Sequence, residues 1–104
     1  MTALKLDGKV ILITGGSQGL GEGIAREAAS AGAAGVALAG RNATRGDAVA
    51  SSLTAAGCPA IFLAGDLGEE SYCRAFVAAA ESRFGRIDGL VNAAGLTDRG
   101  TIED

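Results

Sequence analysis

One glycine-rich stretch, Thr14 to Gly21, constrains the fold of this chain more than any other, and it reads Thr-Gly-Gly-Ser-Gln-Gly-Leu-Gly. The apolar residues 10–13 come directly before it, and residues 20–31, which have helical periodicity, follow it. A glycine-rich turn that joins a buried strand to a helix can hold the pyrophosphate of a dinucleotide, because the helix N-terminus offers unpaired N–H groups to the anion. The stretch therefore predicts a strand, a phosphate-binding turn and a helix in succession.

Three glycines have separate roles in such a turn. Gly15 allows the sharp turn, Gly19 lets the backbone approach the phosphates, and Gly21 lets the helix pack close to the strand. A glycine turn can also join a strand to a helix without any ligand, so the interpretation depends on the rest of the sequence.

Strands and helices alternate along the remaining sequence with short connections between them. We expect strands over 9–14, 35–39, 60–64 and 89–93, and helices over 19–31, 43–56 and 69–84. Gly32, Gly57 and Gly85 are predicted to end the helices, and residues 96–104 to form a loop. This alternation requires a parallel sheet with right-handed crossovers, and the short apolar strands are typical of a sheet buried on both faces.

Apolar residues at helical spacing predict the buried face of each helix. These are Leu20, Ile24 and Ala28 in the first helix, Val49, Leu53 and Ala56 in the second, and Cys73, Val77, Ala80 and Phe84 in the third. Asn42 is placed to cap the second helix, and Glu69 and Glu70 complement the dipole at the start of the third.

Composition and charge argue against several classes of function. The 104 residues carry a net charge of −3, without the basic surface that nucleic-acid binding needs. No apolar run approaches the ~20 residues that span a membrane, and the N-terminus has no secretory pattern. The sequence has no histidine and two cysteines, Cys58 and Cys73, which argues against a zinc site and predicts reduced thiols. We expect a cytoplasmic protein without a metal.

Four features line up in order along the chain: the glycine turn, Arg41 after the second strand, Asp66-Leu67 after the third, and Asn92-Ala93-Ala94-Gly95 after the fourth. Together they resemble the short-chain dehydrogenase/reductase family, specifically its N-terminal cofactor-binding half, over essentially the whole chain. The spacing of the glycines also matches this family. The resemblance implies an α/β fold with a Rossmann-like, doubly wound parallel sheet in the order 3-2-1-4. It also implies one dinucleotide-binding domain over residues 1–104.

The resemblance also indicates which residues would bind the dinucleotide. The phosphate turn would consist of Gly15, Ser17, Gln18, Gly19, Leu20 and Gly21. Asp66 would accept a hydrogen bond from the adenine amino group, with the Leu67 backbone beside it. Asn92 would help to hold the central strands together. The small residues Ala93, Ala94 and Gly95 would leave room for the ribose and nicotinamide. Asp66 could instead only cap the following helix, and Asn92 could be purely structural.

The end of the second strand bears on the choice of cofactor. A carboxylate there would bind the 2′-hydroxyl of NAD, but this chain has Gly40, followed by Arg41 and Asn42. The Arg41 guanidinium can pair with a 2′-phosphate in a forked geometry, and Arg45 could assist it, so we expect NADP(H) rather than NAD(H). Alternatively, Arg41 is a solvated surface charge or covers the adenine face, and Gly40 tolerates NAD.

No catalytic residue can be assigned from the sequence. Members of this family use a Tyr-x-x-x-Lys pair, together with a Ser and an Asn, and the Tyr acts as general acid or base. The one tyrosine here is Tyr72, with Phe76 four residues later, and the two lysines, Lys5 and Lys9, both precede the glycine turn. We therefore expect an inactive fragment of a longer oxidoreductase that transfers hydride between NADP(H) and a carbonyl or alcohol substrate.

Two other classes of function fit the same motifs. One is a non-catalytic dinucleotide-binding or regulatory module, and the other is a structural fragment with an empty site. The expected partners are the dinucleotide and, in a longer parent, a small-molecule substrate. An unpaired edge of the fourth strand would also favour self-association.

Overall fold

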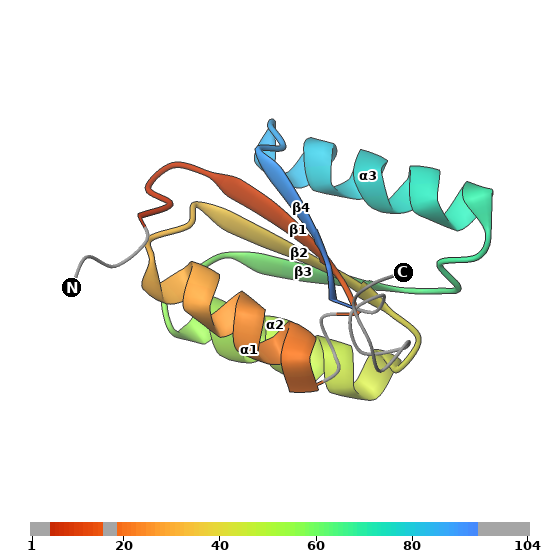
Figure 1. Ribbon diagram of the computed structural model, residues 1–104, viewed down its shortest axis with the longest axis horizontal. Helices are drawn as coiled ribbons and strands as arrows, with labels where there is room; N and C mark the ends of the chain where they lie inside the picture. Colours follow the sequence, from red (N-terminus) through yellow and green to blue (C-terminus); the bar gives the residue numbers. More distant parts are fainter. Residues whose placement is uncertain (1–4, 16–18, 94–104) are drawn as a thin grey trace, which may run out of the picture.

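A computed structural model describes residues 5–15 and 19–93 of the chain. In these residues four parallel strands form one sheet in the order β3-β2-β1-β4 (Figure 1). The elements are β1 (Val10–Thr14), α1 (Gly19–Ser30), β2 (Gly35–Gly40), α2 (Ala43–Ala55), β3 (Ala60–Ala64), α3 (Glu70–Phe84) and β4 (Gly89–Asn92). The Rossmann-like fold and its strand order are confirmed, and no predicted element end is wrong by more than one residue. The loop expected over 96–104 lies outside the described residues.

Helices cover both faces of the sheet. Figure 1 shows α1 and α2 side by side on one face and α3 on the other. The core on the α1 and α2 face is formed chiefly by Ile13, Val36, Leu38, Val49 and Leu53. The core on the α3 face is formed chiefly by Val10, Leu12, Ala37, Ala39, Phe76 and Ala80. The two apolar layers fix the sheet between the helices.

The central strands are buried, whereas the outer strands are not. Every residue of β2 is buried and most of β1 is, but β3 is only partly buried and β4 alternates between partly buried and exposed. The expectation that all strands are buried on both faces is therefore wrong for β3 and β4. Each of these strands has a neighbouring strand on one side only, in the described part of the chain.

The buried faces of the helices differ in part from those predicted. In α1 the predicted Ala28 is buried together with Ala25, and the predicted Ile24 is partly buried against the same core, while Leu20 is 43% exposed. In α3 the core position belongs to Phe76, and Val77 is exposed. In α1 the small alanines meet the sheet and Leu20 is displaced to the surface, whereas in α3 the larger Phe76 is the buried residue and the smaller Val77 is exposed. Ala56, predicted to be buried, lies at the exposed C-terminal cap of α2.

The helix ends follow the predicted signals. Asn42 is the N-cap of α2, and its side-chain oxygen accepts a hydrogen bond from the Arg45 backbone N–H at 3.0 Å. Gly85 ends α3 in a left-handed conformation with φ of 81°, and its N–H donates to the carbonyl of Glu81 at 2.8 Å. These two caps fix the points at which the chain enters α2 and leaves α3.

Candidate functional site

The carboxyl ends of the four strands meet at one edge of the sheet because all strands run parallel. The strand order reverses at β1, which pairs with β2 on one side and β4 on the other. Ligands of open α/β sheets bind outside the carboxyl ends of the strands at such a reversal. The predicted site residues follow these strand ends, so the topology brings their segments to a common edge.

The glycine turn leaves β1 at this edge. Gly15 has a φ of 78°, which glycine adopts without strain, and its N–H donates to the Ala39 carbonyl of β2 at 2.6 Å. The helix α1 starts at Gly19, where a side chain would meet no atom within 4 Å, and Gly21 is buried. The open backbone at Gly19, at the N-terminus of α1, fits a phosphate group. Ser17 and Gln18 lie outside the described residues.

A side-chain contact joins the ends of the two strands that flank the reversal. The Thr14 hydroxyl donates to the side-chain oxygen of Asn92 at 2.9 Å. Thr14 is paired with Asn92 in the β1–β4 register, and the next residue, Ala93, is buried. Thr14 was not among the predicted site residues, although its position at the end of an apolar strand was a signal for a role. Ala94 and Gly95 lie outside the described residues.

Arg41 and Asp66 contact each other across the ends of β2 and β3. Nη2 of Arg41 lies 3.2 Å from Oδ1 of Asp66, and the two side chains are 79% and 49% exposed. The same carboxylate oxygen accepts a hydrogen bond from the Gly68 backbone N–H at 2.8 Å. This backbone hydrogen bond, followed by the Arg41 guanidinium, lowers the pKa of Asp66 below its ordinary value. Asp66 therefore carries a negative charge at neutral pH.

Asp66 does not cap the following helix. The N-cap position of α3 is occupied by Glu69, and the Asp66 side chain closes a short turn onto Gly68 instead. The alternative in which Asp66 only caps α3 is thus wrong. Leu67 is partly buried and packs against the core on the α3 face.

Arg45 is also held by a carboxylate. Its Nη2 atom lies 3.4 Å from Oε1 of Glu22, and Oε2 of Glu22 accepts from Arg26 at 2.8 Å. The Arg26 hydrogen bond is the largest cause of the lowered pKa of Glu22. Glu22 thereby links the first turns of α1 and α2. Glu22 was not among the predicted site residues, although an acidic residue in the first turn of a helix, four residues before an arginine, was a recognisable signal.

The single tyrosine has a structural position. The Tyr72 hydroxyl donates to the carbonyl of Leu63, and its ring stacks on Phe76 with centroids 6.5 Å apart. Burial raises the pKa of Tyr72, the opposite of the shift that a general base requires. The described residues contain no group of three or more His, Cys, Asp or Glu that could hold a metal ion. None of the helices in that part of the chain has the length and hydropathy of a membrane-spanning segment.

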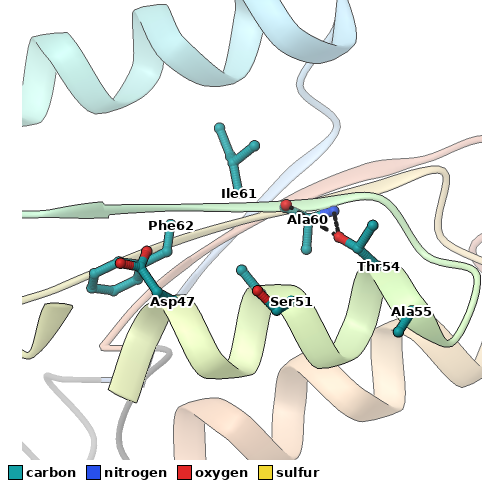
Figure 2. Close-up of a pocket in the computed structure, with 8 residues that line it drawn as sticks. Asp47, Ser51, Thr54, Ala55, Ala60, Ile61 and Phe62 are labelled. Atoms are coloured by element: carbon teal, nitrogen blue, oxygen red, sulfur yellow. Dashed lines mark hydrogen bonds between the residues drawn. The ribbon is translucent and has the colours of Figure 1, made fainter. Parts of the chain in front are cut away.

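A shallow groove lies between α2 and β3 (Figure 2). Its lining is formed by Asp47, Ala50, Ser51, Thr54, Ala55, Ala60, Ile61 and Phe62. The Thr54 hydroxyl accepts a hydrogen bond from the Ala60 N–H at 3.1 Å and lies 3.4 Å from the Ala60 carbonyl oxygen. It therefore satisfies both backbone polar groups at the start of β3. No residue predicted to bind the dinucleotide lines this groove.

The fold and the order of its strands together define an α/β protein of the Rossmann-like type. The family model described as short chain dehydrogenase matches residues 9–104, which is most of the chain. The chain belongs to the short-chain dehydrogenase family.

Relatives and solved structures of greater length match the chain over part of their own length. An uncharacterized oxidoreductase of Methylorubrum extorquens is 41% identical over 100 residues, which cover 96% of this chain and 40% of that protein. The L-sorbose reductase of Gluconobacter frateurii, complexed with NADPH and L-sorbose, matches with a TM-score of 0.79 at 33% identity, over 86% of this chain and 34% of that one. A short-chain dehydrogenase/reductase of Burkholderia phymatum in complex with NAD matches with a TM-score of 0.78 at 31% identity. The match covers 86% of this chain and 31% of that one. The chain thus spans less than half the length of these relatives.

Proposed function

We propose that residues 1–104 form the dinucleotide-binding domain of a longer short-chain oxidoreductase and that this domain prefers NADP(H) to NAD(H). The observation that carries the proposal is the position of Arg41. Its exposed guanidinium follows β2 at the same sheet edge as the glycine turn, and Gly40 stands where a carboxylate would select NAD. Similar solved structures contain either NADPH or NAD, so the family alone does not decide the cofactor.

Each strand end would contact a different part of the dinucleotide. The glycine turn, Gly15 and Ser17 to Gly21, would hold the pyrophosphate at the N-terminus of α1. Arg41 and Asn42 would face the 2′-phosphate, and Asp66 with Leu67 would face the adenine. Residues 92–95 would leave space for the ribose and nicotinamide. The bound nicotinamide would supply or accept the hydride.

In the whole protein, we propose, the hydride passes between NADP(H) and a carbonyl or alcohol substrate. The 104-residue chain alone would bind the dinucleotide without turnover, because it has no Tyr-x-x-x-Lys pair and the hydroxyl of its one tyrosine, Tyr72, is hydrogen-bonded to the Leu63 carbonyl. The free thiols of Cys58 and Cys73 fit a reducing compartment such as the cytoplasm. We also propose that the 104-residue chain associates with itself through the outer edge of β4.

Calorimetric titration of the 104-residue protein with NADP⁺ and NAD⁺ tests the cofactor proposal. We expect tighter binding of NADP⁺, and we expect Arg41→Ala to weaken NADP⁺ binding about tenfold or more, since a charge-assisted hydrogen bond is lost, with little change for NAD⁺. Arg83→Ala is the control, because Arg83 lies in the last turn of α3, far from the strand carboxyl ends. Equal affinity for the two dinucleotides, or equal weakening of both by Arg41→Ala, would contradict the proposed preference.

A further inference from the structure

The arginine expected to select the cofactor already has an anionic partner. Nη2 of Arg41 contacts Oδ1 of Asp66 at 3.2 Å, and this is the one hydrogen bond that the Arg41 guanidinium makes to the described residues. A 2′-phosphate at the end of β2 would seek the same guanidinium. The carboxylate and the phosphate are therefore alternative partners for one cation.

Within the described residues, the Asp66 carboxylate has two hydrogen-bond partners and the Arg41 guanidinium has one. Asp66 is fixed by the hydrogen bond from the Gly68 N–H at 2.8 Å, and its own carbonyl accepts from the Glu69 N–H at 2.9 Å. Arg41, by contrast, has a 79% exposed side chain, and among the described residues its guanidinium is hydrogen-bonded to Asp66 alone. An incoming phosphate would thus have to draw Arg41 away from a carboxylate that stays in place, and that carboxylate would repel the phosphate.

We propose that Asp66 is a specificity-determining residue that lowers the preference of the site for NADP(H) over NAD(H) by holding Arg41 in an ion pair. NAD(H) has no 2′-phosphate and binds with the pair intact. NADP(H) must exchange the Asp66 carboxylate for its own phosphate on Arg41. This inference rests on the proposed function, and it concerns the ratio of the two affinities rather than either affinity alone.

The variant Asp66→Asn separates the charge from the local structure. An asparagine oxygen can still accept the Gly68 N–H, so the turn after β3 is retained while the ion pair is lost. Any change in a contact between residue 66 and the adenine affects NAD⁺ and NADP⁺ alike and cancels in the ratio of their dissociation constants. The same ratio is measured with 5′-AMP and adenosine 2′,5′-bisphosphate, which differ by the 2′-phosphate alone.

We expect Asp66→Asn to raise the preference for NADP⁺ over NAD⁺ about two- to fivefold, the range that an exposed ion pair supports. Raising the salt concentration should shrink this gain, because screening weakens the competing pair. The gain should also be smaller in the background of Arg41→Ala, where no pair exists to be broken. Glu81→Gln, an equal charge change on the exposed surface near the far end of α3, should leave the ratio unchanged.

A ratio that stays constant in Asp66→Asn would overturn the inference while leaving the proposed function intact. A ratio that falls would also overturn it, and would show that Asp66 holds Arg41 ready for the phosphate. If the unmodified protein binds neither dinucleotide, the proposed function itself fails and the inference falls with it. Thermal unfolding checks that each variant is folded, and Asp66→Ser provides a second neutral variant if Asp66→Asn is not.

Discussion

The residue Asp88 links the start of β4 to the start of β1 through hydrogen bonds to Val10. Its Oδ2 accepts from the Val10 N–H at 2.8 Å, while its own N–H donates to the Val10 carbonyl at 2.9 Å. Arg86 adds two hydrogen bonds, from Nε at 2.8 Å and from Nη2 at 2.7 Å. The contact closes the amino end of the sheet, opposite the candidate site.

Low pH should weaken the hydrogen bonds of the Asp88 carboxylate. The Arg86 hydrogen bonds, followed by that from Val10, lower the pKa of Asp88 below its ordinary value of 3.8. The unfolded chain then takes up this proton at a higher pH than the folded chain does. The stabilisation is complete above the ordinary pKa and is lost as the pH falls through the lowered one. We expect urea unfolding midpoints of the protein to fall from about pH 5 downward, and less steeply in Asp88→Asn.

The control for this experiment is Glu81→Gln, whose carboxyl lies on the exposed surface of α3. It should keep the acid dependence of the unmodified protein. Asp66 and Glu22 also have lowered pKa values, so Asp88→Asn should reduce the dependence without abolishing it. An Asp88→Asn profile parallel to that of the unmodified protein would contradict the assignment.

The sequence predicts which residues follow the strand ends, but it does not predict their contacts. Arg41 and Asp66 could be placed at one sheet edge because parallel strands end together. That they pair with each other depends on the turn from Asp66 to Gly68, which aims the carboxylate towards β2. The link from Glu22 to Arg45 likewise depends on how α1 and α2 lie side by side, a relation that no local pattern contains.

At the scale of elements, a glycine in β2 admits an aromatic ring from α3. A Cβ atom built on Gly35 would lie 2.5 Å from Cδ1 and Cε1 of Phe84, closer than real Cβ contacts come. Phe84 belongs to the last turn of α3 and packs into the core on that face. The missing side chain of Gly35 therefore sets how closely α3 approaches the sheet.

We expect Gly35→Ala to destabilise the fold by about 1–3 kcal/mol, because the added methyl group overpacks the contact with Phe84. Gly23→Ala is the matched control: Gly23 is exposed inside α1, and a Cβ there would meet nothing within 4 Å. This control should be stabilising by about 0.5–1 kcal/mol, since alanine favours helix. Urea denaturation measures both, and destabilisation by Gly23→Ala or tolerance of Gly35→Ala would refute the packing argument.

The element boundaries were predictable, whereas the helix faces were only partly so. Gly85 and Asn42 carry local signals for a helix end and a helix start, and both act as predicted. The choice between Val77 and Phe76 as the buried residue depends on the angle at which α3 crosses the sheet. Periodicity cannot distinguish two neighbouring apolar residues without that angle.

At the scale of the whole molecule, the two outer strands are protected to different extents. At the start of β3, the hydroxyl of Thr54 engages both backbone groups of Ala60 (Figure 2). In β4 the apolar side chain of Leu90 is 65% exposed, and no strand in the described residues pairs with its outer side. An exposed strand edge with an apolar side chain favours pairing with another chain.

The 104-residue polypeptide should therefore associate in a concentration-dependent manner through β4. Leu90→Lys should reduce this association, because a charged side chain on an edge strand opposes pairing. Val77→Lys makes a similar change at an exposed valine of α3 and should leave the association unchanged if β4 is the interface. Sedimentation velocity over a range of concentrations measures all three proteins. A monomer at every concentration would refute the association, and a stronger effect of Val77→Lys would move the interface from the β4 edge to the outer surface of α3.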